Sequence, residues 1–490
     1  MTNIIISNKD EVYVKIDCDD GIGYELRDHF TFMVPGAQFS PQFRAKVWDG
    51  KIRLYDIRNK LIYRGLVPQI ESFCKSRNYK LTYIDEVYAS EFSLTEAIQF
   101  AKNINPKFEP RDYQLDAFTH AIRNRRSLLL SPTASGKSLI IYLIIRYLLA
   151  NGNRKGLIIV PTISLVEQLN SDFKEYSETN DWDTESNCHR IYGGQEKITN
   201  KAVTISTWQS IYQMPKSYFK DYDFVIGDEA HQFKAKSLAD IMTNLVNARN
   251  RIGLTGTLDG TKTHKLVLEG LFGAVNKVVS TKELMDQKHL AEFEIKCLLL
   301  KHSDSICQAA KNFTYQQEIE YIVLNETRNK FIRNLSLSLK GNTLILYQYV
   351  DKHGKILYNM INDKADKRKV FLVYGDTDVA VREDIRRIVE TEKDAIIVAS
   401  YGTFSTGINI RNLHNIIFAS PSKSRVRNLQ SIGRGLRKSE SKESAVLYDI
   451  ADDLRYKAHE NFTIKHFAER IKIYGEEKFK FKIYKIELKG

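Results

Sequence analysis

Two runs of alternating strand-like and helix-length segments constrain the fold of this chain more than any other feature. The first run extends from about residue 108 to 280, and the second follows a transitional segment at about 281 to 325. Such alternation predicts a parallel β-sheet with helices on both faces. Ligands of such sheets bind at the carboxyl ends of the strands. We therefore expect an α/β chain with two parallel-sheet units in tandem.

The strands of these units are expected at short apolar runs. In the first unit they fall at 128–130, 157–160, 203–206, 224–226 and 251–254, and in the second at 343–347, 370–374, 395–399, 415–419 and 445–448. A basic and apolar alternation at 478–485 predicts one more strand with a basic face. An edge strand whose charges hinder aggregation is the favoured interpretation, ahead of a nucleic-acid face.

The first 88 residues read as a small α+β domain. Its expected strands are 4–6, 12–16, 30–34 and 80–84, with a helix at 67–77. Within 44–54, alternating residues flank Asp49-Gly50, which predicts a two-residue hairpin. The domain boundaries expected for the chain are 1–88, 89–282, 283–455 and a short C-terminal extension, 456–490.

Length and composition restrict the class of protein. The chain has 490 residues, of which 43% are hydrophobic and 27% charged, so we expect several globular domains. Its longest apolar run, 139–150, is too short to span a membrane, and the apolar N-terminal segment is too short for a secretory signal. A cytoplasmic location is expected. Five cysteines without a Cys-x-x-Cys pair signal neither a disulfide framework nor a zinc or iron–sulfur site.

The net charge of +13 favours an anionic partner, most often nucleic acid, over a merely basic surface. The charge is uneven, because residues 1–43 carry −4 and residues 44–80 carry +7. Basic and aromatic residues interleave in the second segment, which suits phosphate contacts and base stacking. A solvated strand face over core aromatics explains the same pattern, and both interpretations stay open. The candidate contacts are Arg44, Lys51, Arg53 and Arg58.

The stretch 127–138, an apolar run followed by SPTASGKS, resembles a phosphate-binding loop. Backbone N–H groups at the start of a helix can face a polyphosphate, Lys137 adds a charge, and the Ser138 hydroxyl can ligate Mg²⁺. The loop has fewer glycines than the strict pattern, because Ser131 and Ala134 replace them. We expect both positions to adopt φ angles open to non-glycine residues.

A second chemical motif is FVIGDEAH at 224–231, an apolar strand that delivers Asp228 and Glu229 to its carboxyl end. A nucleotide hydrolase needs one carboxylate for Mg²⁺ and a neighbour that orients or deprotonates water. A lone Asp-Glu pair is more often solvated surface. This pair follows the loop within the same alternation, which favours the catalytic interpretation.

Together the motifs of residues 108–455 resemble the superfamily 2 helicases and translocases. The matching blocks are RDYQ at 111, SPTASGKS at 131, VPTISLVEQL at 160, TISTWQS at 204, DEAH at 228, LTGT at 254, LILYQYV at 344, SYGTFSTGINI at 400 and QSIGRGLR at 430. The resemblance implies two RecA-like lobes that use ATP and Mg²⁺.

The resemblance also implies a role for each matching position. Adenine and phosphate binding falls to Arg111, Gln114, Thr133, Gly136, Lys137 and Ser138, with Ser138 and Asp228 as the Mg²⁺ ligands. Hydrolysis falls to Lys137, Asp228, Glu229 and Gln430, with Arg434 and Arg437 as arginine fingers. Coupling between the lobes falls to His231, Thr255 and Thr257, and the nucleic-acid track to Pro161, Thr162, Ser206, Thr207 and Thr403.

The stretch VPGAQFSPQFRAKVWDGKIRLYD at 34–56 resembles the start of the recombination and repair helicases of T4-like phages. That family implies an ATP-dependent DNA helicase that unwinds or branch-migrates R-loops, D-loops, Holliday junctions and stalled forks. It further implies a monomer in the host cytoplasm, whose partners are branched DNA, RNA–DNA hybrids and candidate single-strand-binding or recombination proteins. An RNA helicase, the motor subunit of a nuclease complex and a degenerate ATPase that only binds remain as alternatives.

Overall fold

The structure is a computed structural model, and it describes residues 3–85, 91–258, 260–403, 410, 412–422, 424, 429, 431–433 and 444–488. The chain divides into two compact units. The first contains residues 1–131 and 136–278, and the second contains 132–135 and 279–490. In the described part of the chain, every helix is too short or too polar to cross a membrane.

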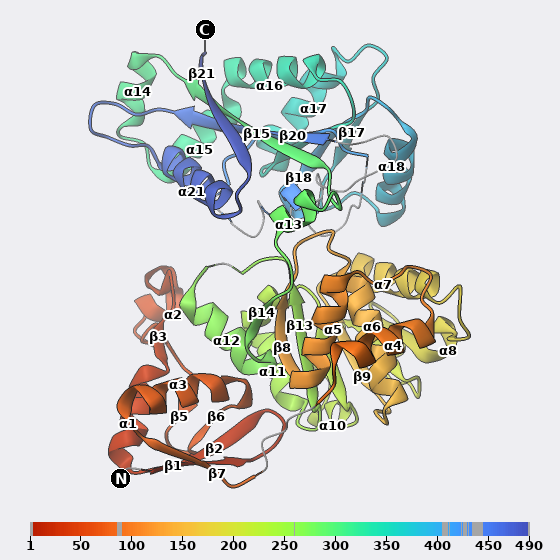
Figure 1. Cartoon of the computed structure of the whole chain (residues 1–490). Helices are drawn as coiled ribbons and strands as arrows, with labels where there is room; N and C mark the ends of the chain where they lie inside the picture. The colour runs from red at the N-terminus through yellow and green to blue at the C-terminus, as the bar shows by residue number, and fades with distance from the viewer. Residues whose placement is uncertain are drawn as a thin grey trace. The chain divides into compact units, whose positions relative to one another are not determined.

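The N-terminal domain is a mixed sheet with helices beside it (Figure 1). The sheet has the order β5-β6-β2-β1-β7, in which β1 pairs antiparallel with β2 and parallel with β7. The strands are β1 (Asn3–Asn8), β2 (Tyr13–Asp17), β5 (Tyr55–Asp56), β6 (Leu61–Tyr63) and β7 (Lys80–Tyr83), and the main helices are α1 (Asp20–His29) and α3 (Val67–Arg77). The sequence predicted α3 and three of these strands, but α1 was missed.

The predicted hairpin at Asp49-Gly50 is wrong. The strand β4 (Lys51–Arg53) pairs with β3 (Thr31–Met33), so residues 34–50 form a long loop with η1 (Ala37–Phe39) and α2 (Pro41–Arg44). Pro41 lies in the first turn of α2, which takes 41–44 out of an extended conformation. Gly50 still turns the chain, with φ 76°, but it packs against Met33, far back in the sequence.

The N-terminal domain docks on the helix α12 (Lys262–Phe272) of the following domain. The short helix η2 (Arg64–Leu66) contacts α12 so closely that a Cβ on Gly65 would lie 2.1 Å from the Glu269 carbonyl oxygen. Glu11 joins the two domains, because its carboxylate lies 3.0 Å from Arg64 and 2.7 Å from Arg126. The two domains therefore form one packed body.

The remainder of the first unit is a seven-stranded parallel sheet, as expected, with the order β10-β11-β9-β12-β13-β8-β14. Its strands are β8 (Arg126–Leu130), β9 (Gly156–Val160), β10 (Cys188–Ile191), β11 (Val203–Thr207), β12 (Phe224–Gly227), β13 (Asn250–Thr255) and β14 (Val275–Lys277). The five predicted strands form its centre, and the two short edge strands β10 and β14 were missed.

Helices cover both faces of this sheet (Figure 1). Neighbouring strand residues divide between two cores, because Leu128 packs with α11 and α12, whereas Leu129 packs with α4, α5 and α6. The helices are α4 (Leu94–Ile104), α5 (Asp112–Asn124), α6 (Lys137–Ala150), α7 (Ile163–Tyr176), α8 (Thr184–Asn187), α9 (Trp208–Ile211), α10 (Lys216–Phe219) and α11 (Lys236–Asn244), with η3 (Ala230–Lys234). Eight apolar residues of α6 are buried, which explains its continuous apolar sequence.

The second unit is also a seven-stranded parallel sheet, with the order β17-β18-β16-β19-β20-β15-β21. Its strands are β15 (Glu292–Lys301), β16 (Thr343–Tyr347), β17 (Val370–Val373), β18 (Ile396–Ser400), β19 (Asn415–Phe418), β20 (Ser444–Asp453) and β21 (Lys480–Glu487). The helices that cover it are α13 (Thr281–Asp286), α14 (Asp304–Ala310), α15 (Tyr315–Leu324), α16 (Glu326–Ser338), α17 (Lys355–Asn362) with η4 (Val350–Gly354), α18 (Val379–Thr391) and α21 (Phe462–Glu476).

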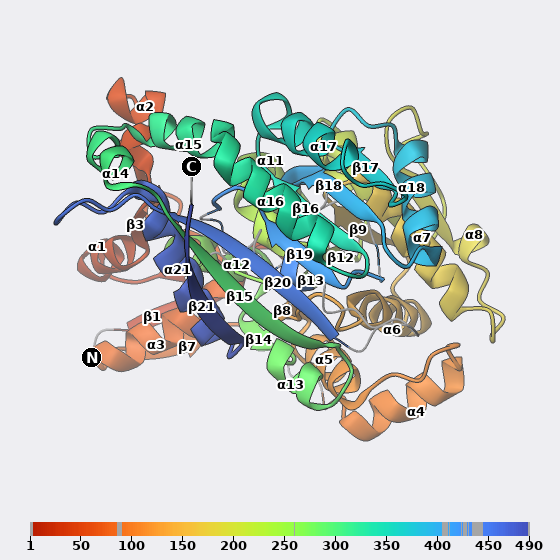
Figure 2. The same cartoon turned by 90° about the horizontal axis from the view of Figure 1, so that it is seen from above.

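The interpretation of 281–325 as merely transitional is wrong, because it contains β15. This ten-residue strand lies between β20 and β21, and Figure 2 shows the three strands side by side. The basic strand β21 lies at the edge of the sheet, as favoured from its charges, and most of its residues are exposed.

Two buried ion pairs tie β20 to the helices of the second unit. Asp449 accepts from Arg470 at 2.8 Å, and Asp452 accepts from Arg328 at 2.9 Å. Burial alone would raise the pKa of Asp452, but Arg328 and His302 hold that pKa below its usual range. Removal of one partner would leave a buried unpaired charge, so these pairs fix the helices on the sheet.

Candidate nucleotide and nucleic-acid sites

The loop 131–136 joins the carboxyl end of β8 to the first residue of α6. Gly136 precedes α6 in the left-handed conformation, with φ 77°. A Cβ at this position would lie 2.3 Å from Nε2 of Gln114. Backbone conformation and close packing therefore both require glycine here, although other glycines of the pattern are absent.

The expectation for the two substituted positions is half right. Ser131 is not among the described residues with positive φ, and its N–H donates to the Thr255 carbonyl at 2.9 Å. Ala134 has φ 67°, against expectation. Between Ala134 and the left-handed Gly136, the Ser135 N–H donates to the Pro132 carbonyl at 3.2 Å, which closes a tight turn. The Ala134 methyl group costs this conformation about 1–2 kcal/mol.

Gln114, on α5, contacts the loop directly. Its Oε1 accepts from the Arg111 N–H at 2.9 Å, and its Nε2 donates to the Gly136 carbonyl at 3.4 Å. The Arg111 side chain donates to Tyr113 at 2.9 Å. The structure thus places the predicted adenine-recognition residue against the predicted phosphate loop. Thr133 lies in the same loop, where the Ser135 hydroxyl donates to the Pro132 carbonyl at 2.6 Å.

The acidic pair lies beyond the carboxyl end of β12, two strands from β8 in the sheet. The Asp228 carboxylate accepts from the Glu229 N–H at 2.9 Å. Burial, with help from the Glu229 carboxylate, raises the pKa of Asp228 to about 6, although the nearby Lys137 ammonium opposes this rise. Lys137 and Asp228 therefore share one electrostatic environment, as the two motifs predicted.

The three residues predicted to couple the lobes form a chain of contacts that begins at the acidic pair. His231 Nδ1 lies 3.0 Å from the Thr255 hydroxyl and 3.4 Å from the Glu229 carboxylate. The Thr255 hydroxyl donates to the Thr257 carbonyl at 3.0 Å. The Thr257 Oγ1 is buried without a hydrogen-bond partner in the described structure, an unsatisfied polar atom next to the site.

Sequence reasoning missed one neighbour of the loop. The Ser138 hydroxyl lies 2.7 Å from the Tyr176 hydroxyl at the end of α7. No motif marks Tyr176, because its position depends on how α7 packs against α6. The contact shows that the Ser138 hydroxyl already has a hydrogen-bond partner on α7.

These donors and acceptors fit a nucleoside triphosphate with a divalent cation. The loop that ends at Gly136 leads directly into the N-terminus of the buried helix α6, and a helix N-terminus attracts anions. The buried Asp228 carboxylate with its raised pKa is the hard oxygen ligand that a cation would stabilise in the charged form. Within the described residues, no group of three or more His, Cys, Asp or Glu forms a separate metal site.

A hollow of about 490 Å³ lies at the same carboxyl edge, beyond β9 and β11. Pro161, Thr162 and Thr207, three of the residues predicted to contact nucleic acid, line it. The residues that sequence reasoning missed are Ile163, Tyr192, Gly193, Gly194, Lys197, Gln209 and Ser210. The Gly193-Gly194 pair was the available signal, but His189 and Arg190 interrupt the apolar pattern of β10, so this strand was not predicted.

The other candidate nucleic-acid residues lie elsewhere. Ser206 is fully buried and its hydroxyl bonds to the Ile191 and Thr207 carbonyls, so it supports the strand. Thr403, in the second unit, is buried and lies 2.8 Å from the Ser400 hydroxyl.

Of the N-terminal candidates, Arg44, Lys51 and Arg53 lie on α2 and β4, and Arg58 lies in the β5–β6 turn. Arg53 forms an ion pair with Asp49. Gln430, Arg434 and Arg437 lie outside the described residues.

Comparison with known proteins agrees with this organisation. Family models match residues 3–85 (DNA helicase UvsW, N-terminal), 107–260 (type III restriction enzyme, res subunit) and 326–439 (helicase conserved C-terminal domain). The ATP-dependent DNA helicase uvsW of Enterobacteria phage T4 is 36% identical over 97% of this chain and 98% of its own length. A DNA 3'-5' translocase, XPB2 of Sulfurisphaera tokodaii, is 24% identical over 77% of this chain and 89% of its own.

Among solved structures, that of T4 UvsW covers 99% of this chain and 100% of its own, with 34% identity and a TM-score of 0.52. The sequence, the domain order and the helicase motifs therefore agree with one another. This chain belongs to the UvsW family of ATP-dependent DNA helicases within superfamily 2.

Proposed function

We propose that this helicase unwinds or branch-migrates branched nucleic acids, namely R-loops, D-loops, Holliday junctions and stalled forks. The supporting observation is that the loop before α6 and the 490 Å³ hollow lie at one edge of one sheet. The same unit carries the N-terminal domain, in which residues 44–80 have a charge of +7. We call the edge of the sheet that holds the loop and this hollow the motor edge. The motor edge and the basic domain lie on one body, so different arms of a branched substrate can contact each of them.

In this proposal the nucleotide site binds ATP with Mg²⁺, which supplies the phosphoanhydride whose hydrolysis drives movement. Gly136 and the first turn of α6 hold the phosphates, and Lys137 neutralises their charge. Ser138 and Asp228 hold the cation, while Glu229 orients the attacking water and accepts its proton. Gln114, which already contacts the Gly136 carbonyl, reads the adenine beside Arg111.

His231, Thr255 and Thr257 transmit the state of the nucleotide site in our proposal. The His231 ring bridges Glu229 and Thr255, so a shift of the Glu229 carboxylate moves the end of β13. Gln430, Arg434 and Arg437 are proposed to complete the site from the second lobe, where the two arginines offset charge on the phosphoryl oxygens.

The nucleic-acid track is proposed to run through the hollow at Pro161, Thr162 and Thr207. Hydroxyl and backbone groups there would hold phosphates without reading bases. Thr403 would contribute from the second lobe. Branched DNA and RNA–DNA hybrids are the proposed substrates, bound by a monomer in the host cytoplasm, and single-strand-binding or recombination proteins are proposed partners.

The test compares the wild-type protein with Lys137→Ala on matched R-loop, fork, Holliday-junction, overhang and RNA-duplex substrates. The wild type should separate or migrate the branched DNA substrates with ATP faster than the overhang and the RNA duplex. Lys137→Ala should lose DNA-stimulated ATP hydrolysis and strand separation but keep its DNA affinity, because the lysine contacts phosphate of the nucleotide rather than DNA.

Lys102→Ala is the matched control, because Lys102 is an exposed lysine on α4 outside every proposed site. It should match the wild type in hydrolysis and in strand separation. Hydrolysis retained in Lys137→Ala would refute the nucleotide site. Equal rates on branched and overhang substrates would refute the proposed substrate class.

A further inference from the structure

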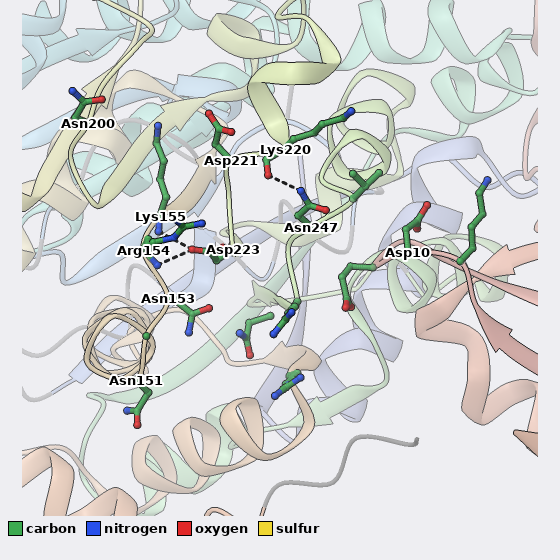
Figure 3. Close-up of a pocket in the computed structure, with 17 residues that line it drawn as sticks. Asp10, Asn151, Asn153, Arg154, Lys155, Asn200, Lys220, Asp221, Asp223 and Asn247 are labelled. Atoms are coloured by element: carbon green, nitrogen blue, oxygen red, sulfur yellow. Dashed lines mark hydrogen bonds between the residues drawn. The ribbon is translucent and has the colours of Figure 1, made fainter. Parts of the chain in front are cut away.

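A second and larger hollow, of about 990 Å³, lies at the amino edge of the first unit's parallel sheet (Figure 3). Its lining comes from the segments that lead into strands: Arg154 and Lys155 precede β9, Asp223 precedes β12, and Arg249 precedes β13. Lys9 to Glu11 of the N-terminal domain complete one wall. Neither the motifs nor the proposed motor site accounts for this hollow.

The hollow lies opposite the motor edge. In a parallel sheet all strands run the same way, so the residues before the strands gather at one edge and the residues after them at the other. Strand β9 shows this directly, because Lys155 before it lines the large hollow, whereas Pro161 after it lines the proposed nucleic-acid track. A ligand in the large hollow therefore occupies a separate site.

Six basic and four acidic residues line the hollow, and most of the acids are already satisfied. Asp223 accepts from the Arg154 and Lys155 N–H groups at 2.7 and 3.1 Å, as the dashed lines in Figure 3 show. Asp10 accepts from two backbone N–H groups. Glu11 is paired with Arg64 and Arg126. Asp221 lacks such a partner among the described contacts, and the six basic residues leave the lining with a net positive charge against its four acids.

Three cations of the lining remain available to a ligand. Arg154, Lys220 and Arg249 are exposed, and their side chains have no ion pair or hydrogen bond within the described structure. The rest of the lining is amide-rich, and Asn153, Asn200 and Asn247 lie around the same opening in Figure 3. Guanidinium, ammonium and amide groups on an open polar surface suit phosphate oxygens.

We infer that this amino-edge hollow binds the sugar–phosphate backbone of a duplex arm of the DNA substrate. The hollow is open and large enough for a polymer, and the N-terminal domain that walls it carries the basic segment 44–80. Contact through phosphates makes binding independent of sequence and strongly dependent on salt. This inference rests on the proposed function, because it assigns one arm of a branched substrate to a second site.

The test uses the full chain with the double substitution Arg154→Glu and Arg249→Glu. Affinity for a fork with a duplex arm should fall about tenfold or more at about 0.1 M salt, and the slope of log Kd against log salt should fall by about 2. Affinity for a short single strand and the ATP hydrolysis that it stimulates should stay unchanged, because the motor edge is intact.

The matched control is Lys102→Glu with Lys311→Glu, an equal charge change at exposed lysines on α4 and after α14. The inference would be overturned if the test variant and the control bound the fork with equal affinity. This holds even if the hollow proved to bind an acidic protein instead of DNA. Arg154→Gln with Arg249→Gln gives a milder version, with a smaller loss expected, should the reversal impair folding. Failure of the wild type to act on any branched substrate would instead refute the proposed function.

Discussion

At the scale of single residues, the conformation of the nucleotide loop includes two left-handed positions, and only one of them is a glycine. Gly136 has the left-handed backbone and lies against Gln114, whereas Ala134 adopts a left-handed φ with a methyl group. The strain at Ala134 is tolerable because alanine is the smallest residue with a Cβ. A side chain at position 136 would add backbone strain and would also collide with the Gln114 side-chain amide, which we propose recognises adenine.

We therefore predict different effects for Gly136→Ala and Ala134→Gly. Gly136→Ala should destabilise the protein by about 1–2 kcal/mol from the backbone alone and should weaken nucleotide binding as Gln114 is displaced. Ala134→Gly relieves similar strain but makes the unfolded chain more flexible, by about 0.4–1 kcal/mol, so its stability should change little. Urea unfolding and a nucleotide-binding titration measure both. Unchanged nucleotide affinity in Gly136→Ala would contradict the proposal that Gly136 and Gln114 form part of the nucleotide site.

Residues of the site that stand in motifs were predictable, and those recruited by packing were not. Lys137 and Asp228 lie in motifs whose chemistry is local, and the structure places them in one electrostatic environment. Tyr176, 38 positions from Ser138 in the chain, reaches it only through the packing of α7 against α6. The φ of Ala134 likewise depends on the turn as a whole rather than on its own side chain.

At the scale of elements, errors arose where pairing is distant in sequence. The Asp49-Gly50 signal predicted pairing between its own flanks, but β4 pairs with β3 across a seventeen-residue loop that spans 34–50. Strand β15 lies between β20 and β21, whose sequences begin more than 140 residues later. Central strands of each lobe were predicted because they are short, apolar and bounded by turn residues.

The packing of η2 on α12 gives a test at this scale. Gly65→Ala places a Cβ against the backbone of Glu269, which cannot yield as a side chain can, so we expect a loss of about 1–3 kcal/mol. Gly21→Ala is the control, because Gly21 lies in α1 with nothing within 4 Å, and it should gain about 0.5–1 kcal/mol. Urea unfolding of both variants measures these changes in the free energy of unfolding. Equal stability of the two variants would contradict tight docking of the N-terminal domain.

At the scale of the whole molecule, two tandem parallel sheets followed from the alternation of strands and helices, and an added N-terminal domain followed from the strand-like and helix-like runs of its first 88 residues. Two compact units emerge, one of which holds both the N-terminal domain and the first sheet. The grouping of those two into one body was not predictable, because it depends on surface contacts such as Gly65 with α12.

A fragment of residues 1–278 should therefore fold and bind DNA by itself. It contains the loop, the acidic pair and both hollows, but it lacks Arg434 and Arg437. If these arginines act as fingers, DNA-stimulated ATP hydrolysis should be at least about a thousandfold slower than in the full chain. Circular dichroism, DNA binding and ATPase assays test this. Hydrolysis at the full-length rate would remove the proposed role of the second lobe.

The strand β9 also predicts a minimum length for a duplex arm that spans both proposed nucleic-acid sites. From Lys155 at one end to Pro161 at the other the chain advances six residues, or roughly 20 Å in extended backbone. That distance equals the rise of about six base pairs of duplex. If one duplex arm contacts both proposed sites, we expect it to need at least about six base pairs, because a shorter arm does not reach from one edge of the sheet to the other.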